Sequence, residues 1–423
     1  MATNNLLTNL IITREAARVL HQEGTFISNV NREYRDEFAR SGMKAGQTIN
    51  MRLPSKYTVR TNATFAAQDH FERSTPLAVL SQYGVDVSFT TVDRTMSLDD
   101  YSRRVIRPAM KQLAAKIEYD ALAAAYKVVN NGVNATTNAV LTYRYFQKMG
   151  QRLTDELAPI GDRTAILNPA SVVEFLDATK GLFAAQSNLN EQFREGMMGR
   201  TGGLEVGENT LLPPHTTGTM AGSPLTFGNA LGLSTTANSW ASTTALSITG
   251  ATATGTVKAG DIITLSGVYA VHPESKANTG RLQQFVVQAD VTMTTATSTY
   301  TVTVKPALIY GSGNAFQNTA LSGVSDTTGL TVTRLGASAT AFAQDLAFHK
   351  DAFAFVSVDL EDMSPYGAAC TRAVSDNISM RFIQQYDSSA DAVRGRFDVL
   401  WGFAPLLPEL AVRHLTTQSL LNL

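Results

Sequence analysis

Several features that mark common protein classes are missing from this chain. It has 423 residues and one cysteine, Cys370, so it contains no internal disulfide, no four-cysteine zinc site and no CxxC redox pair. No run of about 18 apolar residues occurs, so no segment is predicted to span a membrane. The N-terminus lacks a basic segment followed by an apolar core, so we expect no signal peptide and a protein that is made and used in a cytoplasm.

Charge is scarce and almost balanced. Charged residues make up 17% of the chain and the formal net charge is −1, whereas about 25% charged residues is usual. A dedicated binder of nucleic acid or of a membrane surface needs a strong basic excess, so both classes are disfavoured. The low charge predicts a surface that is partly covered by neighbouring molecules.

Motifs for catalysis, metal binding and phosphate binding are also missing. The six histidines lie more than forty residues apart, so no metal-ligand spacing exists. No GxxxxGK[ST] loop or GxSxG elbow occurs. Cys370 lies among small residues, which favours a buried, unreactive thiol. The acidic pairs Asp99/Asp100 and Glu361/Asp362 are better explained as a helix start and a turn than as catalytic carboxylates. We expect a structural protein rather than an enzyme, with no cofactor and no metal.

Composition marks one segment as a separate domain. Residues 221–340 hold nine charged residues in 120, against 62 in the other 303, and a change of this size is typical of a domain boundary. The segment contains β-branched and aromatic runs such as DIITLSGVYAV and STYTVTVKPALIY, in which Val302 and Val304 alternate with threonines. This pattern predicts a small antiparallel β-barrel or sandwich inserted into a larger domain.

The N-terminal part of the flanking sequence predicts a helix and an extended arm. Residues 9–22 have the apolar spacing of an amphipathic helix, with Gly24 as its stop. Residues 46–59 and 76–92 are strand candidates, joined by the polar segment 61–76. Together they predict a hairpin that reaches about 45 Å. A two-stranded ribbon is not stable alone in water, so it must fold onto its own domain or lie on another subunit.

The remaining flanks mix helices and strands in irregular order. A long helix is expected from Pro108, with an apolar stripe on one side and charged residues elsewhere; the stripe comprises Met110, Leu113, Ile117, Ala121 and Ala124, and the charged residues are Lys111, Lys116, Glu118 and Lys127. A helix is expected over 144–157, and a strand is followed by Asn168 as helix cap and Pro169 at the first helical position. Residues 352–360 predict a buried strand. The C-terminal segment predicts a strand, a turn at Gly402 and a short apolar strand. This order indicates an α+β fold.

These features together resemble one protein family. The most specific stretch is KAGDIITLSGVYAVHPESKANTGRLQQFVV at 258–287, supported in collinear order by REYRDEF, MKAGQTINMRLP, LNP, GRTGGLEVGENTLLPPHTTGT and RFDVLWGFAPLLPELAV. The chain resembles the major capsid (coat) proteins of tailed double-stranded DNA bacteriophages, in the P22-type branch of the HK97 fold. The resemblance implies an HK97-like α+β capsid fold with an inserted antiparallel β-barrel domain.

The resemblance also implies a division of the chain. It implies an N-terminal arm at 1–45, an extended E-loop hairpin at 46–92, a spine helix of the peripheral (P) domain at 93–135 and the first part of the axial (A) domain at 136–220. The inserted β-domain would follow at 221–340, then the A-domain return at 341–385 and closing P-domain strands at 386–423. In that branch the insertion can carry a charged loop that meets its counterpart across a two-fold axis; the corresponding stretch here, 229–254, carries no charge, so a neutral contact or none is expected there.

The function implied is self-assembly into an icosahedral shell around packaged double-stranded DNA, in the virion. The partners implied are other copies in hexamers and pentamers, a scaffolding protein, a portal protein and DNA held without specificity, with no membrane. We expect subunit contacts from the hairpin and scaffold contacts from the N-terminal helix; the hairpin residues are Arg52, Lys56, Tyr57, Phe65, His70, Phe71 and Arg73, and the helix residues are Glu15 and Glu23. The alternative function is an encapsulin-like nanocompartment shell, which the insertion disfavours.

Overall fold

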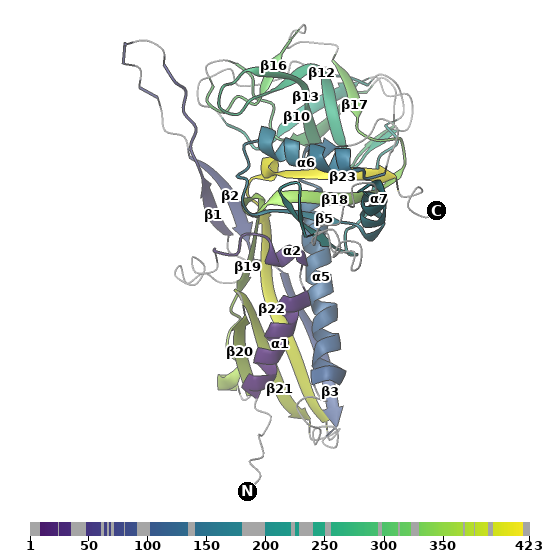
Figure 1. Ribbon diagram of the computed structural model, residues 1–423. Helices are drawn as coiled ribbons and strands as arrows, with labels where there is room; N and C mark the ends of the chain where they lie inside the picture. Colours follow the sequence, from purple (N-terminus) through teal and green to yellow (C-terminus); the bar gives the residue numbers. More distant parts are fainter. Residues whose placement is uncertain are drawn as a thin grey trace. The chain divides into compact units, whose positions relative to one another are not determined.

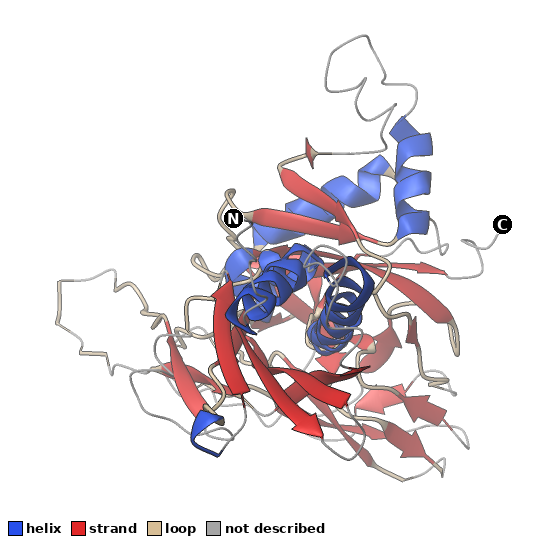
Figure 2. Ribbon diagram, turned by 90° about the horizontal axis from the view of Figure 1, so that it is seen from below, coloured by secondary structure: helices blue, strands red, loops and turns tan. Residues whose placement is uncertain are grey.

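The structure is a computed structural model of the chain. It describes residues 9–23, 25–34, 48–60, 63–65, 67–68, 72–79, 81–90, 102–133, 140–179, 199–220, 225–227, 240–249, 255–294, 298–311, 314–322, 330–366, 369–375, 377–387 and 392–417. Two units are distinguished: Met1–Met51, Thr75–Leu122 and Phe353–Leu406 form the first, and Arg52–Ser74, Ala123–Ala352 and Leu407–Leu423 form the second. Helices and strands are interspersed along the chain (Figure 2), so the fold is mixed α+β.

A five-stranded antiparallel sheet forms the core of the first unit. Its central strand β22 (Ala392–Pro405) pairs with β3 (Ser81–Thr90), β19 (Phe353–Val358) and β21 (Ile378–Asp387), and β20 (Ala369–Ser375) pairs with β21. The buried strand expected over 352–360 is β19, which is confirmed.

The expected turn at Gly402 is wrong. Gly402 lies inside β22 and pairs with Val356 of β19. The glycine has a packing reason, because a Cβ atom there would lie 2.4 Å from the carbonyl oxygen of Ala78. The strand β22 is followed by the 3₁₀ turn η6 (Pro408–Leu410) and then by β23 (Ala411–Thr417).

Helix α1 (Asn9–Glu23) covers β20 and β21 of this sheet (Figure 1). The expected amphipathic helix is therefore confirmed. Its buried stripe includes Ala16, Ala17 and Leu20, and the hydroxyl groups of Thr13 and Thr371 lie 2.6 Å apart. Because a helix of this length is marginal in water, this apolar contact with the sheet is what stabilises it.

The long helix from Pro108 is also confirmed, as α5 (Arg107–Tyr126) after the π-helical turn η2 (Ser102–Ile106). One member of its expected apolar stripe is wrong. Ala124 is exposed and Ala125 is buried instead. Glu118 is 1% exposed, because its carboxylate accepts hydrogen bonds from Thr25 and from the Phe26 backbone N–H (2.6 Å) at the start of the short helix α2 (Thr25–Ser28).

The second unit contains a mixed sheet with the order β4-β23-β18-β5-β7-β6, and β8 also pairs with β18. The strands are β4 (Asn131–Val133), β5 (Arg163–Leu167), β6 (Arg200–Thr201), β7 (Leu204–Glu208), β8 (His215–Thr216), β18 (Ala341–His349) and β23. Helix α6 (Tyr143–Asp155) lies against β18 and β23, and α7 (Pro169–Thr179) against α6. The side chain of Asn168 accepts a hydrogen bond from the Ala170 N–H (3.1 Å), which confirms the expected cap with Pro169 after it.

A second, antiparallel sheet of this unit is built from the low-charge segment. Its order is β13-β15-β10-β9-β17-β12-β16, and β13 also pairs with β12. The strands are β9 (Leu225–Phe227), β10 (Thr244–Thr249), β12 (Ile262–Val271), β13 (Asn278–Val287), β15 (Tyr300–Lys305), β16 (Thr319–Leu321) and β17 (Thr331–Arg334), with β11 (Gly255–Val257) and β14 (Val291–Met293) as a separate pair. Val302 and Val304 are fully buried in one cluster with Phe285 and Leu265, as the alternation along β15 predicts.

The hairpin is shorter in strand structure than expected. β1 (Thr48–Leu53) pairs with β2 (Arg73–Ala78), but β3 belongs to the sheet of the first unit. The segment 76–92 therefore forms parts of two strands rather than one long hairpin partner. Residues 54–60 have no strand assignment. None of the described helices is both long enough and apolar enough to cross a membrane.

Candidate functional site

The first candidate site is the segment beyond the β1–β2 pair, at 54–72. Its described apolar side chains are open to solvent: Val59 is 93% exposed, Phe65 82% and Tyr57 58%. The two sides of the segment are joined by polar contacts, since Thr58 and Gln68 exchange two hydrogen bonds of 2.9 and 2.6 Å. Several exposed apolar groups on one short segment are typical of a surface that binds another molecule.

The structure separates the predicted hairpin contact residues into two kinds. Tyr57 and Phe65 are exposed, and so is Arg52, which forms an exposed ion pair with Glu72 at 3.4 Å. Arg73 differs, because it is 8% exposed and donates to the Pro54 carbonyl at 3.3 Å. Lys56 is half-buried. His70 and Phe71 lie outside the described residues.

The predicted scaffold contacts lie on α1. Glu15 accepts two hydrogen bonds from Arg18, at 2.8 and 2.9 Å, one turn further along the helix. This pair covers the outer side of α1 and is an ordinary surface ion pair. The side chain of Glu23 lies outside the described residues.

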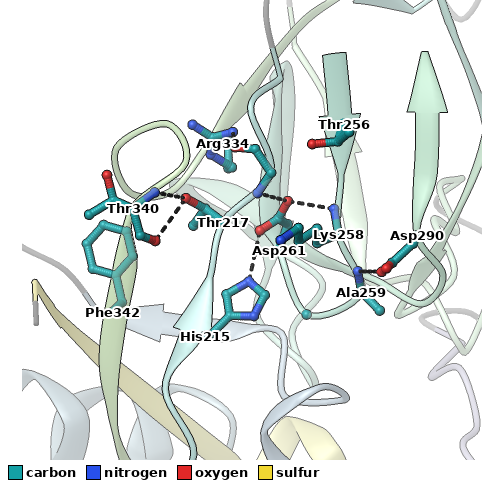
Figure 3. Close-up of polar contacts among 12 residues, drawn as sticks. His215, Thr217, Thr256, Lys258, Ala259, Asp261, Asp290, Arg334, Thr340 and Phe342 are labelled. Carbon is teal, nitrogen blue, oxygen red and sulfur yellow. Dashed lines mark hydrogen bonds and ion pairs between the residues drawn. The ribbon is translucent and has the colours of Figure 1, made fainter. Parts of the chain in front are cut away.

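The second candidate site is the junction between the two sheets of the second unit, where Asp261 is almost fully buried (Figure 3). One carboxylate oxygen accepts a hydrogen bond from His215 Nε2 at 2.9 Å. The other accepts from the backbone N–H groups of Gly218 (3.1 Å) and Lys258 (2.9 Å). The carboxylate thus joins β8 of the mixed sheet, the connection that leaves it and the turn before β12.

Beside the Asp261 carboxylate, the segment that leads into the antiparallel sheet is hydrogen-bonded to the segment that leads out of it. The Thr217 hydroxyl donates to the Ala337 carbonyl at 2.6 Å, and the Thr217 N–H donates to the Thr340 carbonyl at 3.1 Å. The same hydroxyl accepts a hydrogen bond from the Thr340 N–H at 3.2 Å (Figure 3). The Ser338 hydroxyl donates to the Thr219 carbonyl at 2.6 Å. Both crossings into the antiparallel sheet are therefore fixed at one place.

A third contact fixes the two sheets of this unit to each other. The side-chain amide of Gln284 on β13 accepts from the Gly132 N–H (2.9 Å) and donates to the Gly132 carbonyl (3.0 Å). A Cβ atom at Gly132 of β4 would lie 2.5 Å from the Cδ1 atom of Ile262, so the Ile262 side chain would have to move to admit one. Sequence reasoning missed Asp261, His215 and Gln284, since their partners lie far away in the chain.

The described residues offer little chemistry beyond these contacts. Three buried histidines, His215, His349 and His414, each lie near one carboxylate, and no group of three or more His, Cys, Asp or Glu side chains suited to a metal occurs in the described part. Cys370 is half-buried rather than buried, and burial raises the pKa of its thiol. Hydrogen bonds from Ser364 hold the pKa of Asp362 below its ordinary value, as in a turn.

Comparison with solved structures gives several phage proteins. The chain is similar to a structure from Mycobacterium phage Che8 (14% identity, 92% of this chain and 90% of that chain, TM-score 0.46). It is also similar to the capsid of Cyanophage P-SCSP1u (9% identity, 89% and 84%, TM-score 0.42) and to the capsid of Ralstonia phage GP4 (7% identity, 89% and 85%, TM-score 0.42).

No curated protein matches the chain. A family model does, over almost the whole length: the model described as P22 coat protein, gene protein 5, matches residues 1–416. The chain therefore belongs to the P22 coat protein family, and it is a major capsid protein of a tailed phage that forms an icosahedral shell.

Proposed function

We propose that copies of this capsid protein interlock through the segment 54–72, which each subunit lays on its neighbour. The single observation that carries this proposal is the exposure of Val59 and Phe65, at 93% and 82%. Fully burying such side chains contributes about 1.5–3 kcal/mol each. A contact repeated around a ring closes into hexamers and pentamers, because head-to-tail contacts close when the rotation allows it.

We further propose that residues 221–340 form an inserted barrel. The pairings support this: β13, β15, β10, β9, β17 and β12 follow one another, and β12 pairs back to β13. The segment has its own buried cluster, centred on Phe285, Leu265 and Val302. Closure leaves few free strand edges, which suits a domain on a crowded shell. Residues 229–239 and 250–254 of the neutral stretch lie outside the described residues.

The other domain assignments are likewise proposals. The arm at 1–45, the E-loop at 46–92, the spine at 93–135, the A-domain segments 136–220 and 341–385 and the closing strands 386–423 agree with the order of elements. The first unit contains most of the arm, the spine helix and much of the closing strands, which supports a peripheral domain. Its sheet with α1 and α5 would form that domain.

The partners and setting follow from the proposed role. The shell would enclose double-stranded DNA, form around a scaffolding protein that contacts Glu15 and Glu23, and join a portal protein, in the host bacterial cytoplasm. A net charge of −1 suits a wall that holds DNA without specific contacts. We propose no enzymatic activity and no cofactor. An encapsulin-like compartment would hold cargo protein instead, so the contents of purified particles distinguish the two.

The test is a double variant, Val59→Ser with Phe65→Ser. We expect unfolding in urea to stay unchanged, because neither side chain is buried, and shell formation to be lost in negative-stain micrographs. Ile160→Ser is the matched control, since Ile160 is 72% exposed elsewhere in the same unit. Normal shells from the double variant would refute the interlocking role of the segment.

A further inference from the structure

Three basic side chains converge at the base of the segment 54–72. The guanidinium carbon of Arg73 lies 5.5 Å from the centre of the Phe316 ring, and the ammonium group of Lys276 donates to the Gln317 carbonyl at 3.1 Å. Lys56 lies two residues after Pro54, whose carbonyl accepts a hydrogen bond from Arg73 at 3.3 Å. Arg73, at the base of the segment 54–72, and Lys276, in the turn between β12 and β13, thus contact two adjacent residues, Phe316 and Gln317.

No carboxylate in the described part of the chain pairs with these three cations. Within the described part of the chain, none of Lys56, Arg73 and Lys276 forms an ion pair. Arg73 is 8% exposed, and its buried Nε atom has no hydrogen-bond partner among the described residues. Burying cations together without an opposite charge costs free energy, so the cluster is incomplete in the isolated subunit.

The nearby carboxylates do not neutralise the positive charge of the cluster. Glu409 of η6 and Glu156 at the end of α6 act on Lys56 at a distance, but Glu156 lies at 3.5 Å from Arg281, which also pairs with Asp155. Burial lowers the pKa of Lys56 and of Arg73. Burial, with repulsion from those two cations, lowers the pKa of Lys276 to about 8.

We propose that Lys56, Arg73 and Lys276 bind a carboxylate side chain of a second copy of this chain. Arg73 supplies a fixed positive charge, and the half-buried lysines are the groups that a ligand reaches. A single carboxylate on a side chain enters such a recess, whereas phosphates on a stiff duplex do not reach a guanidinium that is 8% exposed. The inference rests on the proposed interlocking of copies, because the site lies at the base of the segment that carries it.

The test is zero-length carbodiimide cross-linking, which joins an amine to a carboxylate in direct contact. Assembled shells and unassembled subunits of the full chain are prepared from a mixture of ¹⁴N- and ¹⁵N-labelled protein. Mass spectrometry then separates links within one copy from links between copies. We expect Lys56 or Lys276 to be linked to an Asp or Glu of another copy in shells, and not in free subunits.

Variants give an independent readout of the same site. Lys56→Gln with Lys276→Gln should raise the protein concentration at which shells form by about tenfold, whereas Lys56→Arg with Lys276→Arg should restore it. Lys305→Gln is the matched control, because burial also lowers the pKa of Lys305 and this lysine does not belong to the cluster of Lys56, Arg73 and Lys276. Urea unfolding followed by tryptophan fluorescence checks that each variant is folded.

Several results would overturn the proposal. Links from either lysine only to Glu409 or Glu156 of the same copy would assign the cations an internal partner. Protection of the lysines only in shells that contain DNA would assign them to phosphate. Shells that form without a cross-link between copies would refute this site alone, whereas a failure of the wild-type chain to form shells would refute the interlocking function and this inference with it.

Discussion

Replacing Asp261 by alanine should loosen the second unit and leave the first almost unchanged. The carboxylate is 1% exposed and accepts three hydrogen bonds, from His215 and from the N–H groups of Gly218 and Lys258. Leaving a buried donor without its acceptor costs about 1–3 kcal/mol. Removing the charge also removes the cost of burying it, so we expect a loss of about 3 kcal/mol in the free energy of unfolding.

The two tryptophans allow the two units to be followed separately. Trp240 belongs to the second unit, where it packs against Phe316, and Trp401 belongs to the first. In a Trp401→Phe background, urea unfolding reports on Trp240 alone. With a slope of about 2–3 kcal/mol per molar urea, the expected loss lowers the midpoint by about 1–1.5 M. In a Trp240→Phe background, the midpoint should hardly move.

Two further variants make this prediction specific. Asp261→Asn keeps one acceptor oxygen, so it should lose less stability than Asp261→Ala. Asp290→Ala is the matched control, because Asp290 is exposed and accepts one hydrogen bond, from the Ala259 N–H at 2.7 Å; its midpoint should change by less than about 0.5 M. An Asp261→Ala midpoint equal to that of Asp290→Ala would refute the argument that this carboxylate joins the two sheets.

Two other predictions concern single positions. Gly402→Ala should lower the free energy of unfolding of the first unit by about 2 kcal/mol, read from Trp401, because its Cβ would lie 2.4 Å from the Ala78 carbonyl; an unchanged midpoint contradicts this. Burial raises the pKa of Glu156 from 4.5 to about 7, against the opposing effect of Arg281. Between these pH values the folded state binds more protons, so stability should fall as pH rises, by less than about 1.4 kcal/mol per pH unit. Glu156→Gln should reduce that slope, and an equal slope in both proteins refutes the assignment.

The spacing of apolar and capping residues along the chain correctly predicted the helices and strands whose formation depends on residues close in sequence. The amphipathic spacing of 9–22, the cap and proline at 168–169 and the alternation around Val302 and Val304 each produce the expected element. The buried faces of these elements can be read from the chain because period and capping are local properties.

The sequence failed where a distant partner decides the structure. Glu118 looks like a surface charge on a helix, yet the backbone of α2, 92 residues away, gives it a buried role. Gly402 looks like a turn residue, yet it is a strand residue beside the Ala78 carbonyl. The polar groups of the junction at Asp261 have the same property, because β8 and β12 come together only after the mixed sheet has formed.

Buried polar groups divide into those that the subunit satisfies alone and those that it does not. Asp261 and Gln284 have complete sets of partners within the second unit, so the attachment of the antiparallel sheet is finished before assembly. The cations at Arg73 and Lys276 and the exposed side chain of Phe65 remain without comparable partners in the described chain. Because a buried cation without an opposite charge and an apolar side chain left in water both cost free energy until a partner covers them, contact between copies is favoured at the base and along the length of the same segment. Removing the apolar and the ionic contacts together should therefore weaken assembly more than removing either alone, while leaving the urea unfolding of the subunit unchanged.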